Sequence, residues 1–133
     1  MVLEKINQPN DIKSLTDEEL KILASEIREF LIEKISVTGG HLASNLGVVE
    51  LTMALHLALD LPKDKDYMGC GTSVLHAQAS DRKTGRFWTG LRKYGGMSGF
   101  PKTERKSNVT ALTTGHSSTS ISAGLGYALA REI

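Results

Sequence analysis

The residues best suited to chemistry lie in Gly115–Arg131, with the sequence GHSSTSISAGLGYALAR. Gly115 has no Cβ, so its backbone can approach a ligand closely. His116 carries a ring nitrogen that donates or accepts a proton near neutral pH. Ser117 and the hydroxyl residues after it can cap a helix or bind a phosphate, because free N–H groups at a helix start favour negative charge. Two interpretations stay open on chemistry alone, an ordinary capped amphipathic helix and a ligand site.

A long helix near the start of the chain is the clearest element available to position such residues. Thr16 and Glu19 have the spacing of a capping box, in which a hydroxyl is followed three residues later by Glu. Apolar residues then recur at intervals of three and four, which predicts one buried face made of Leu20, Leu23, Ile27, Phe30, Leu31 and Ile35. Gly39-Gly40 is typical of a helix end.

A second helix is expected near Val48–Leu59, after a short loop from His41 to Asn45. Its apolar residues are dense enough to predict a mostly buried helix, and they are Leu51, Met53, Ala54, Leu57 and Ala58. We expect Ser44 and Asn45 to cap this helix. For Glu50 we expect a structural role with a polar partner, and for His56 a local partner on the helix face.

The last helix is expected from about Ser118 to the end of the chain. Ile121, Leu125 and Leu129 follow one another at helical spacing, with Ala128 beside them. Between the second and the last helix, the signals of regular structure are weak. A glycine-rich loop at Tyr94–Pro101 is the clearest feature there.

The composition limits the class of protein more than its function. A length of 133 residues fits one modest domain, and 40% apolar with 23% charged residues is typical of a folded globular chain. A formal net charge of +1 gives no reason to expect nucleic acid or an anionic membrane as partner. Cys70 is the only cysteine, so an internal disulfide is excluded. With no signal-peptide pattern and no membrane-length apolar run, we expect a cytoplasmic protein.

Three blocks of sequence resemble one enzyme family. They are SVTGGHLASNLGVVELTMALH (Ser36–His56), RKYGGMSGFPK (Arg92–Lys102) and TTGHSSTSISAGLGYALAR (Thr113–Arg131). In this order and at these separations they resemble 1-deoxy-D-xylulose-5-phosphate synthases, which are transketolase-like, thiamin-diphosphate-dependent transferases that use Mg²⁺. These enzymes condense pyruvate with glyceraldehyde 3-phosphate and release CO₂, at the first step of non-mevalonate isoprenoid biosynthesis. Their product also feeds thiamin and pyridoxal synthesis.

The resemblance implies roles for four residues. Gly115, His116 and Ser117 match the family's Gly-His-Ser triplet, which contacts thiamin diphosphate. His41 matches a loop histidine that faces the substrate and assists proton transfer, and we therefore expect it to be catalytic. No residue of this chain is assigned to a metal.

The same resemblance implies an α/β fold, with a parallel sheet flanked by helices. Residues 1–133 would form a single partial domain, the N-terminal diphosphate-binding part, without the pyrimidine-binding and C-terminal domains. Pyruvate and glyceraldehyde 3-phosphate would be the substrates, and the full-length family is homodimeric. In the family, the Mg²⁺ site is a GDG motif with a later Asn, which this chain lacks. We therefore expect the chain alone to be inactive.

One segment does not fit the family. Met68–Thr84 reads MGCGTSVLHAQASDRKT where the family has a strand ending in a motif like WDVGHQSYxHKxLTGR, whose His contacts the cofactor. Codons can be chosen for Met68–Thr84 that, read one nucleotide later, encode WDVGHQSYMHKLLTGR. We therefore expect a frameshifted stretch over about residues 68–90.

Two other functions stay open from the sequence. The chain could be a small helical interaction module without catalytic activity, which fits its apolar helices and lack of a metal motif. It could also be one half of a split transketolase-type enzyme, with a partner chain supplying the remaining domains. The interaction module does not account for three family blocks in the correct order, whereas the half-enzyme stays open.

Overall fold

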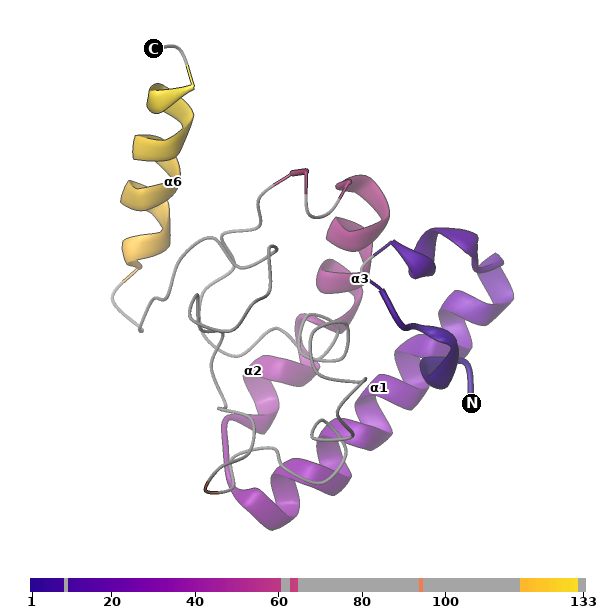
Figure 1. Ribbon diagram of the computed structural model, residues 1–133. Helices are drawn as coiled ribbons and strands as arrows, with labels where there is room; N and C mark the ends of the chain where they lie inside the picture. The colour runs from indigo at the N-terminus through magenta and orange to yellow at the C-terminus, as the bar shows by residue number, and fades with distance from the viewer. Residues whose placement is uncertain (9, 61–62, 65–93, 95–117, 132–133) are drawn as a thin grey trace.

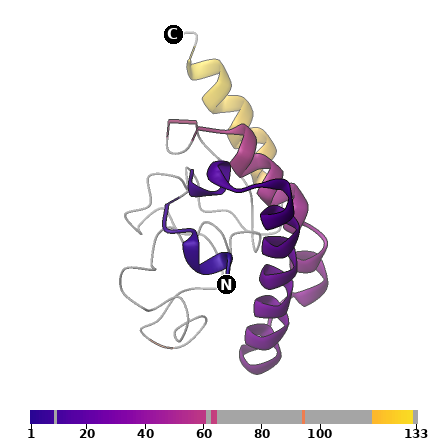
Figure 2. The same cartoon turned by 90° about the vertical axis from the view of Figure 1, so that its right-hand side faces the viewer.

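The structure is a computed structural model and describes residues 1–8, 10–60, 63–64, 94 and 118–131. Within these described residues, two short 3-10 helices precede four α-helices, and the bounds are η1 (Leu3–Lys5), η2 (Asp11–Ser14), α1 (Asp17–Thr38), α2 (Leu42–Leu46), α3 (Val49–Ala58) and α6 (Thr119–Ala130). Figure 1 shows η1, η2, α2 and α3 gathered along α1, while α6 stands apart from them. Figure 2 shows the same group from the side of the N-terminal segment.

Helix α1 begins at the predicted capping box. The Thr16 hydroxyl accepts the Glu19 N–H at 3.3 Å, and the Glu19 carboxylate accepts the Thr16 N–H at 3.1 Å. Two of the N–H groups that lack a partner inside the helix are thereby satisfied. The helix ends at Gly39, whose φ of 71° lies in the left-handed region that favours glycine. The start and end predicted from the sequence are both confirmed.

The core lies between α1, the N-terminal segment and α3. From α1 it takes the predicted face, with Leu23, Ala24, Ile27, Phe30 and Leu31 buried and Leu20 and Ile35 packed at its margin. Val2, Leu3, Ile6 and Ile12 cover that face from the N-terminal segment, and Val49 and Met53 cover it from α3. Full burial of a large aliphatic side chain contributes about 1.5–3 kcal/mol, so this cluster supplies most of the stabilisation among the described residues.

A carboxylate on α1 fixes the N-terminal segment in place. The two oxygens of Glu26 accept the backbone N–H groups of Val2 at 3.1 Å and Leu3 at 2.7 Å. These N–H groups stand at the start of η1, where no earlier carbonyl is available to them. Glu26 therefore helps to hold Leu3, which is fully buried, against α1.

The prediction of a parallel sheet is wrong for the part of the chain that the structure describes. Residues 1–8, 10–60, 63–64, 94 and 118–131 contain helices and turns but no strand. The sheet was expected from the family resemblance, whereas the local sequence signals of these residues are helical periods and caps. The first expected strand falls on residues 68–84, which lie outside the described residues.

The prediction of a mostly buried second helix holds for one side of α3 only. Its buried residues are Val49, Thr52, Met53 and His56. Of the residues that we expected to be buried, Met53 alone is, whereas Leu51 is 54% exposed and Leu57 is 37% exposed. Apolar density does not tell which face of a helix meets the core when both faces are apolar.

The contacts of Glu26 give a first prediction. Glu26→Ala removes an ionised acceptor from two backbone N–H groups, and hydrogen bonds to charged groups are worth about 1.5–3 kcal/mol. We expect the free energy of unfolding, measured by urea denaturation, to fall by about that amount. Glu29→Ala is the matched control, because Glu29 is exposed on the same helix. Equal losses in the two variants would contradict a specific role for Glu26.

The capping box gives a prediction about pH. Lys5 donates to Glu19 at 2.8 Å, and this hydrogen bond, with that from the Thr16 N–H, lowers the pKa of Glu19 from 4.5 to about 2. A pKa lowered by folding stabilises the protein above the unfolded value, and this stabilisation is lost as pH falls toward the folded value. Urea denaturation should therefore show wild type more stable than Glu19→Gln at pH 6, with the difference shrinking between pH 4.5 and 2. A difference independent of pH would contradict this.

Candidate functional site

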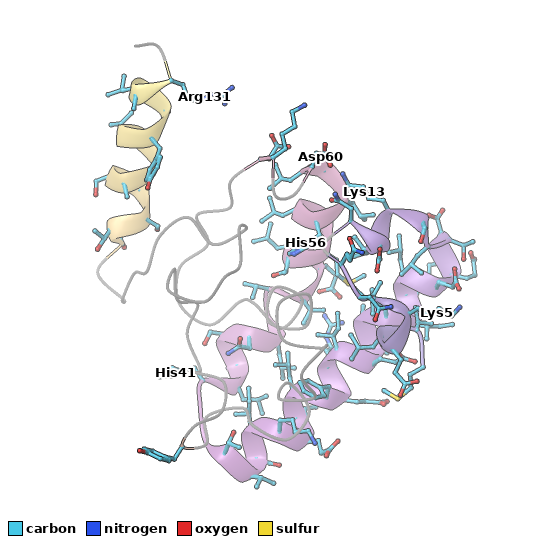
Figure 3. All side chains as sticks on the ribbon, viewed as in Figure 1. Lys5, Lys13, His41, His56, Asp60 and Arg131 are labelled. Carbon is cyan, nitrogen blue, oxygen red and sulfur yellow. The ribbon has the colours of Figure 1, made fainter. Side chains whose placement is uncertain are left out.

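His41, the expected catalytic residue, lies in the connection between α1 and α2. Gly39 and Gly40 both have positive φ, at 71° and 150°, and turn the chain after α1. His41 then occupies the N-cap position of α2, and Figure 3 labels it at the edge of the helical group. The residue is exposed, so its imidazole is accessible to a small molecule.

The backbone of His41 is held by the helix that follows it. The Asn45 side-chain amide donates to the His41 carbonyl oxygen at 2.7 Å, and the Ser44 hydroxyl contacts the same oxygen at 3.4 Å. Leu42 and Leu46 pack against the core and anchor α2. His41 is therefore fixed in position at its main chain, while its side chain lies at the surface.

The predicted caps of the second helix are wrong. Val48 is the N-cap of α3 and makes no side-chain cap hydrogen bond. Ser44 and Asn45 belong instead to α2, a helical turn within what was expected to be a loop, and both bond to the carbonyl of His41. Sequence signals missed this turn because its five residues are too few to display a helical period.

Helix α3 is fixed at both ends. At its start, one terminal nitrogen of Arg28 on α1 lies 2.5 and 2.6 Å from the two carboxylate oxygens of Glu50. The hydrogen bond from Arg28 lowers the pKa of Glu50. Just beyond the helix end, Asp60 accepts from the Asn10 amide at 3.1 Å and lies 3.9 Å from the Lys13 ammonium. Figure 3 labels Lys13 and Asp60. The expectation that Glu50 meets a polar partner is confirmed.

Two further residues of this region are Arg28 on α1 and His56 on α3. Arg28 was not singled out from the sequence, because its partner lies 22 positions away and no local pattern links them. His56 is 2% exposed, and its Nδ1 lies 2.9 Å from the carbonyl oxygen of Thr52 one turn earlier. The predicted local partner of His56 is therefore confirmed, and its burial makes it part of the core.

The three expected cofactor-binding residues, Gly115, His116 and Ser117, lie outside the described residues. The structure resumes at Ser118, which has a left-handed φ of 56° and precedes α6. Ser118 is the N-cap residue, but its side chain makes no cap hydrogen bond. The start of the last helix was therefore predicted correctly.

The described residues offer no ligand set for a metal ion. No group of three or more His, Cys, Asp or Glu side chains within residues 1–8, 10–60, 63–64, 94 and 118–131 could hold one. Among these same residues, no helix combines the length and apolar character that a membrane crossing requires.

Comparison with known sequences matches the chain to one enzyme family. Residues 3–133 match the model of a family described as 1-deoxy-D-xylulose-5-phosphate synthase. Proteins with that name from Lachnoclostridium phytofermentans, Halothermothrix orenii and Clostridium beijerinckii are 55%, 53% and 52% identical to this chain over 133 residues. Each alignment covers 99% of this chain but only 20–21% of the relative, so the chain spans about a fifth of their length. On this evidence the chain belongs to the 1-deoxy-D-xylulose-5-phosphate synthase family.

Proposed function

We propose that this chain supplies part of the active site of a 1-deoxy-D-xylulose-5-phosphate synthase. The reaction is the condensation of pyruvate with glyceraldehyde 3-phosphate with release of CO₂, at the entry to non-mevalonate isoprenoid, thiamin and pyridoxal biosynthesis. The observation that carries the proposal is the family match across residues 3–133, with relatives more than 50% identical. An interaction module would not require this match along the whole chain. We further propose a cytoplasmic homodimer, as the family resemblance implies.

In this proposal, His41 and the triplet Gly115–Ser117 act on different parts of the reaction. His41 is exposed at a fixed position of the main chain, which suits a group that moves a proton to or from a substrate. Gly115 allows close approach of a diphosphate, and His116 and Ser117 offer hydrogen-bond donors to it. A positioned donor is most useful where negative charge is concentrated.

Thiamin diphosphate is the proposed cofactor, with Mg²⁺ bound to its diphosphate. The cofactor supplies an electron sink for the carbon that loses CO₂, while the protein supplies placement and electrostatics. No described residue is assigned to the metal, since none belongs to a possible ligand group.

We also propose that Met68–Thr84 is the out-of-frame product of a stretch that encodes WDVGHQSYMHKLLTGR. The present residues of the segment do not resemble the family, whereas both flanks do. When a reading frame is shifted arbitrarily, the new frame is not expected to encode the family motif over this length. The cofactor-contacting His of that motif would then be missing from this chain, and His76 would not replace it.

A chimeric enzyme tests both proposals. Residues 1–133 replace the matching part of the Lachnoclostridium phytofermentans synthase, either unchanged or with Met68–Thr84 exchanged for WDVGHQSYMHKLLTGR. With thiamin diphosphate, Mg²⁺ and both substrates, the exchanged chimera should release CO₂ from pyruvate at least about a hundredfold faster than the unchanged one, since lost active-site donors cost 10²–10³. The 133-residue chain alone should show no turnover.

The unaltered relative is the positive control, and circular dichroism establishes that each chimera is folded. Equal rates for the two chimeras would overturn the frameshift proposal. A folded exchanged chimera without turnover would overturn the proposed function.

The proposed roles of the two histidines give a separate prediction. In the active chimera, His41→Ala and His116→Ala should each lower kcat/KM at least about tenfold, because positioned acid–base groups contribute 10²-fold or more. Ser36→Ala is the control, since Ser36 is exposed near the end of α1 and its hydroxyl donates to the Glu33 carbonyl oxygen rather than to His41. Steady-state kinetics provide the measurement. If His41→Ala keeps the wild-type kcat/KM, the proposed role of His41 in the active site is wrong, while the proposed role of His116 is unaffected.

A further inference from the structure

The chain reaches His41 through two glycines. Gly39 and Gly40 have positive φ values of 71° and 150°. Glycine has more backbone freedom than any other residue. A Cβ added at Gly39 would meet no atom within 4 Å apart from its chain neighbours, so nothing crowds the chain there. Contacts from α2, on the other side of His41, are therefore best placed to fix the orientation of this residue.

Three donors from α2 approach the carbonyl oxygen of His41. The side-chain amide of Asn45 lies at 2.7 Å, whereas the backbone N–H of Asn45 and the hydroxyl of Ser44 both lie at 3.4 Å. The usual N–H···O distance is about 2.9–3.0 Å, so the first contact is short and the other two are long. The Asn45 side chain is therefore the strongest of these three donors.

A restraint on this oxygen acts on a whole peptide unit. The His41 carbonyl and the Leu42 N–H belong to the same planar unit, which moves as a rigid body. Leu42 and Leu46 pack against the core, and Asn45 is half-buried on the same helix. The Asn45 side chain thereby ties the backbone at His41 to a helix that is itself anchored.

The position of the imidazole depends on this backbone, because the Cα–Cβ bond takes its direction from the main chain. An acid–base group must lie within about 3 Å of the proton that it moves. A displacement of about 1 Å can cost about a hundredfold in rate. His41 is exposed, so its main chain is a natural place to restrain it.

We propose that Asn45 is a positioning residue for His41, which it orients by holding the His41 carbonyl oxygen with its side-chain amide. This inference rests on the proposed role of His41 in proton transfer. Asn45 itself touches no reacting atom. A contact that only stabilised α2 would act on the stability of the fold, whereas a positioning contact acts on the rate through His41.

Nuclear magnetic resonance of the 133-residue chain tests the restraint without any activity. Asn45→Ala removes the side-chain donor while alanine favours the helix, and Asn45→Ser restores a donor that can reach the carbonyl four residues earlier. The amide order parameter of Leu42 reports on the peptide unit. It should be about 0.85 in wild type and in Asn45→Ser, and should fall toward about 0.6 in Asn45→Ala.

Asn7→Ala is the matched control, because the exposed Asn7 also donates its side-chain amide to a backbone carbonyl, that of Lys5 at 3.1 Å. This variant should keep the wild-type order parameter at Leu42. If Asn45→Ala loses its helical circular-dichroism signal, Asn45→Asp replaces it, since an ionised carboxylate keeps the shape but cannot donate. An unchanged order parameter at Leu42 would overturn the proposal, whatever the reaction of the enzyme.

Kinetics in the active chimera test the link to His41. Asn45→Ala should lower kcat at least about tenfold and change KM for pyruvate less than about threefold, because a misplaced acid–base group slows the chemical step. In a His41→Ala background the same substitution should lower kcat less than about twofold, since the group that Asn45 positions is gone. Asn45→Ser should restore most of the rate.

The two backgrounds separate this inference from the proposed function. An equal loss of kcat from Asn45→Ala in both backgrounds would overturn the positioning role and leave the role of His41 intact. A wild-type kcat in His41→Ala would overturn both.

Discussion

The apolar face of α1 is the feature on which the other described elements near it depend. Its residues Leu23, Ile27 and Phe30 form one buried cluster together with side chains of the N-terminal segment and of α3. The N-terminal segment has only two short 3-10 helices of its own and too few residues to form a core by itself. The same cluster holds α2 through Leu42 and Leu46, so the position of His41 also follows from α1.

The charged contacts around this core orient the elements more than they stabilise them. Exposed ion pairs are worth about 0–1 kcal/mol each, whereas one large buried apolar side chain contributes about 1.5–3 kcal/mol. The ion pair of Arg28 and Glu50 therefore sets the rotation of α3 about its own axis. The packing of α3 on α1 depends mainly on the buried apolar side chains. Glu26 differs, because its two oxygens satisfy backbone N–H groups in a partly buried place.

Prediction from the sequence succeeded where the signal is local. The start, end and buried face of α1 follow from a capping box, a glycine pair and a repeated apolar spacing, each within a few residues. It failed for α2, which is too short to show a period, and for the face of α3, because both of its sides are apolar. The prediction of a parallel sheet came from the family resemblance rather than from a local sequence pattern, and the described residues contain no strand. For the site, the sequence predicted a loop at His41, whereas the structure places His41 at the N-cap of α2, and the partner of Glu50 lies far along the chain.

The family match supports a synthase segment in which His41 and Gly115–Ser117 flank a stretch that does not resemble the family. The nucleotide sequence beneath Met68–Thr84 tests this view most directly. If a synthase gene has been read out of frame here, these codons, read one nucleotide later, encode WDVGHQSYMHKLLTGR. Codons that spell an unrelated peptide in that frame would contradict it.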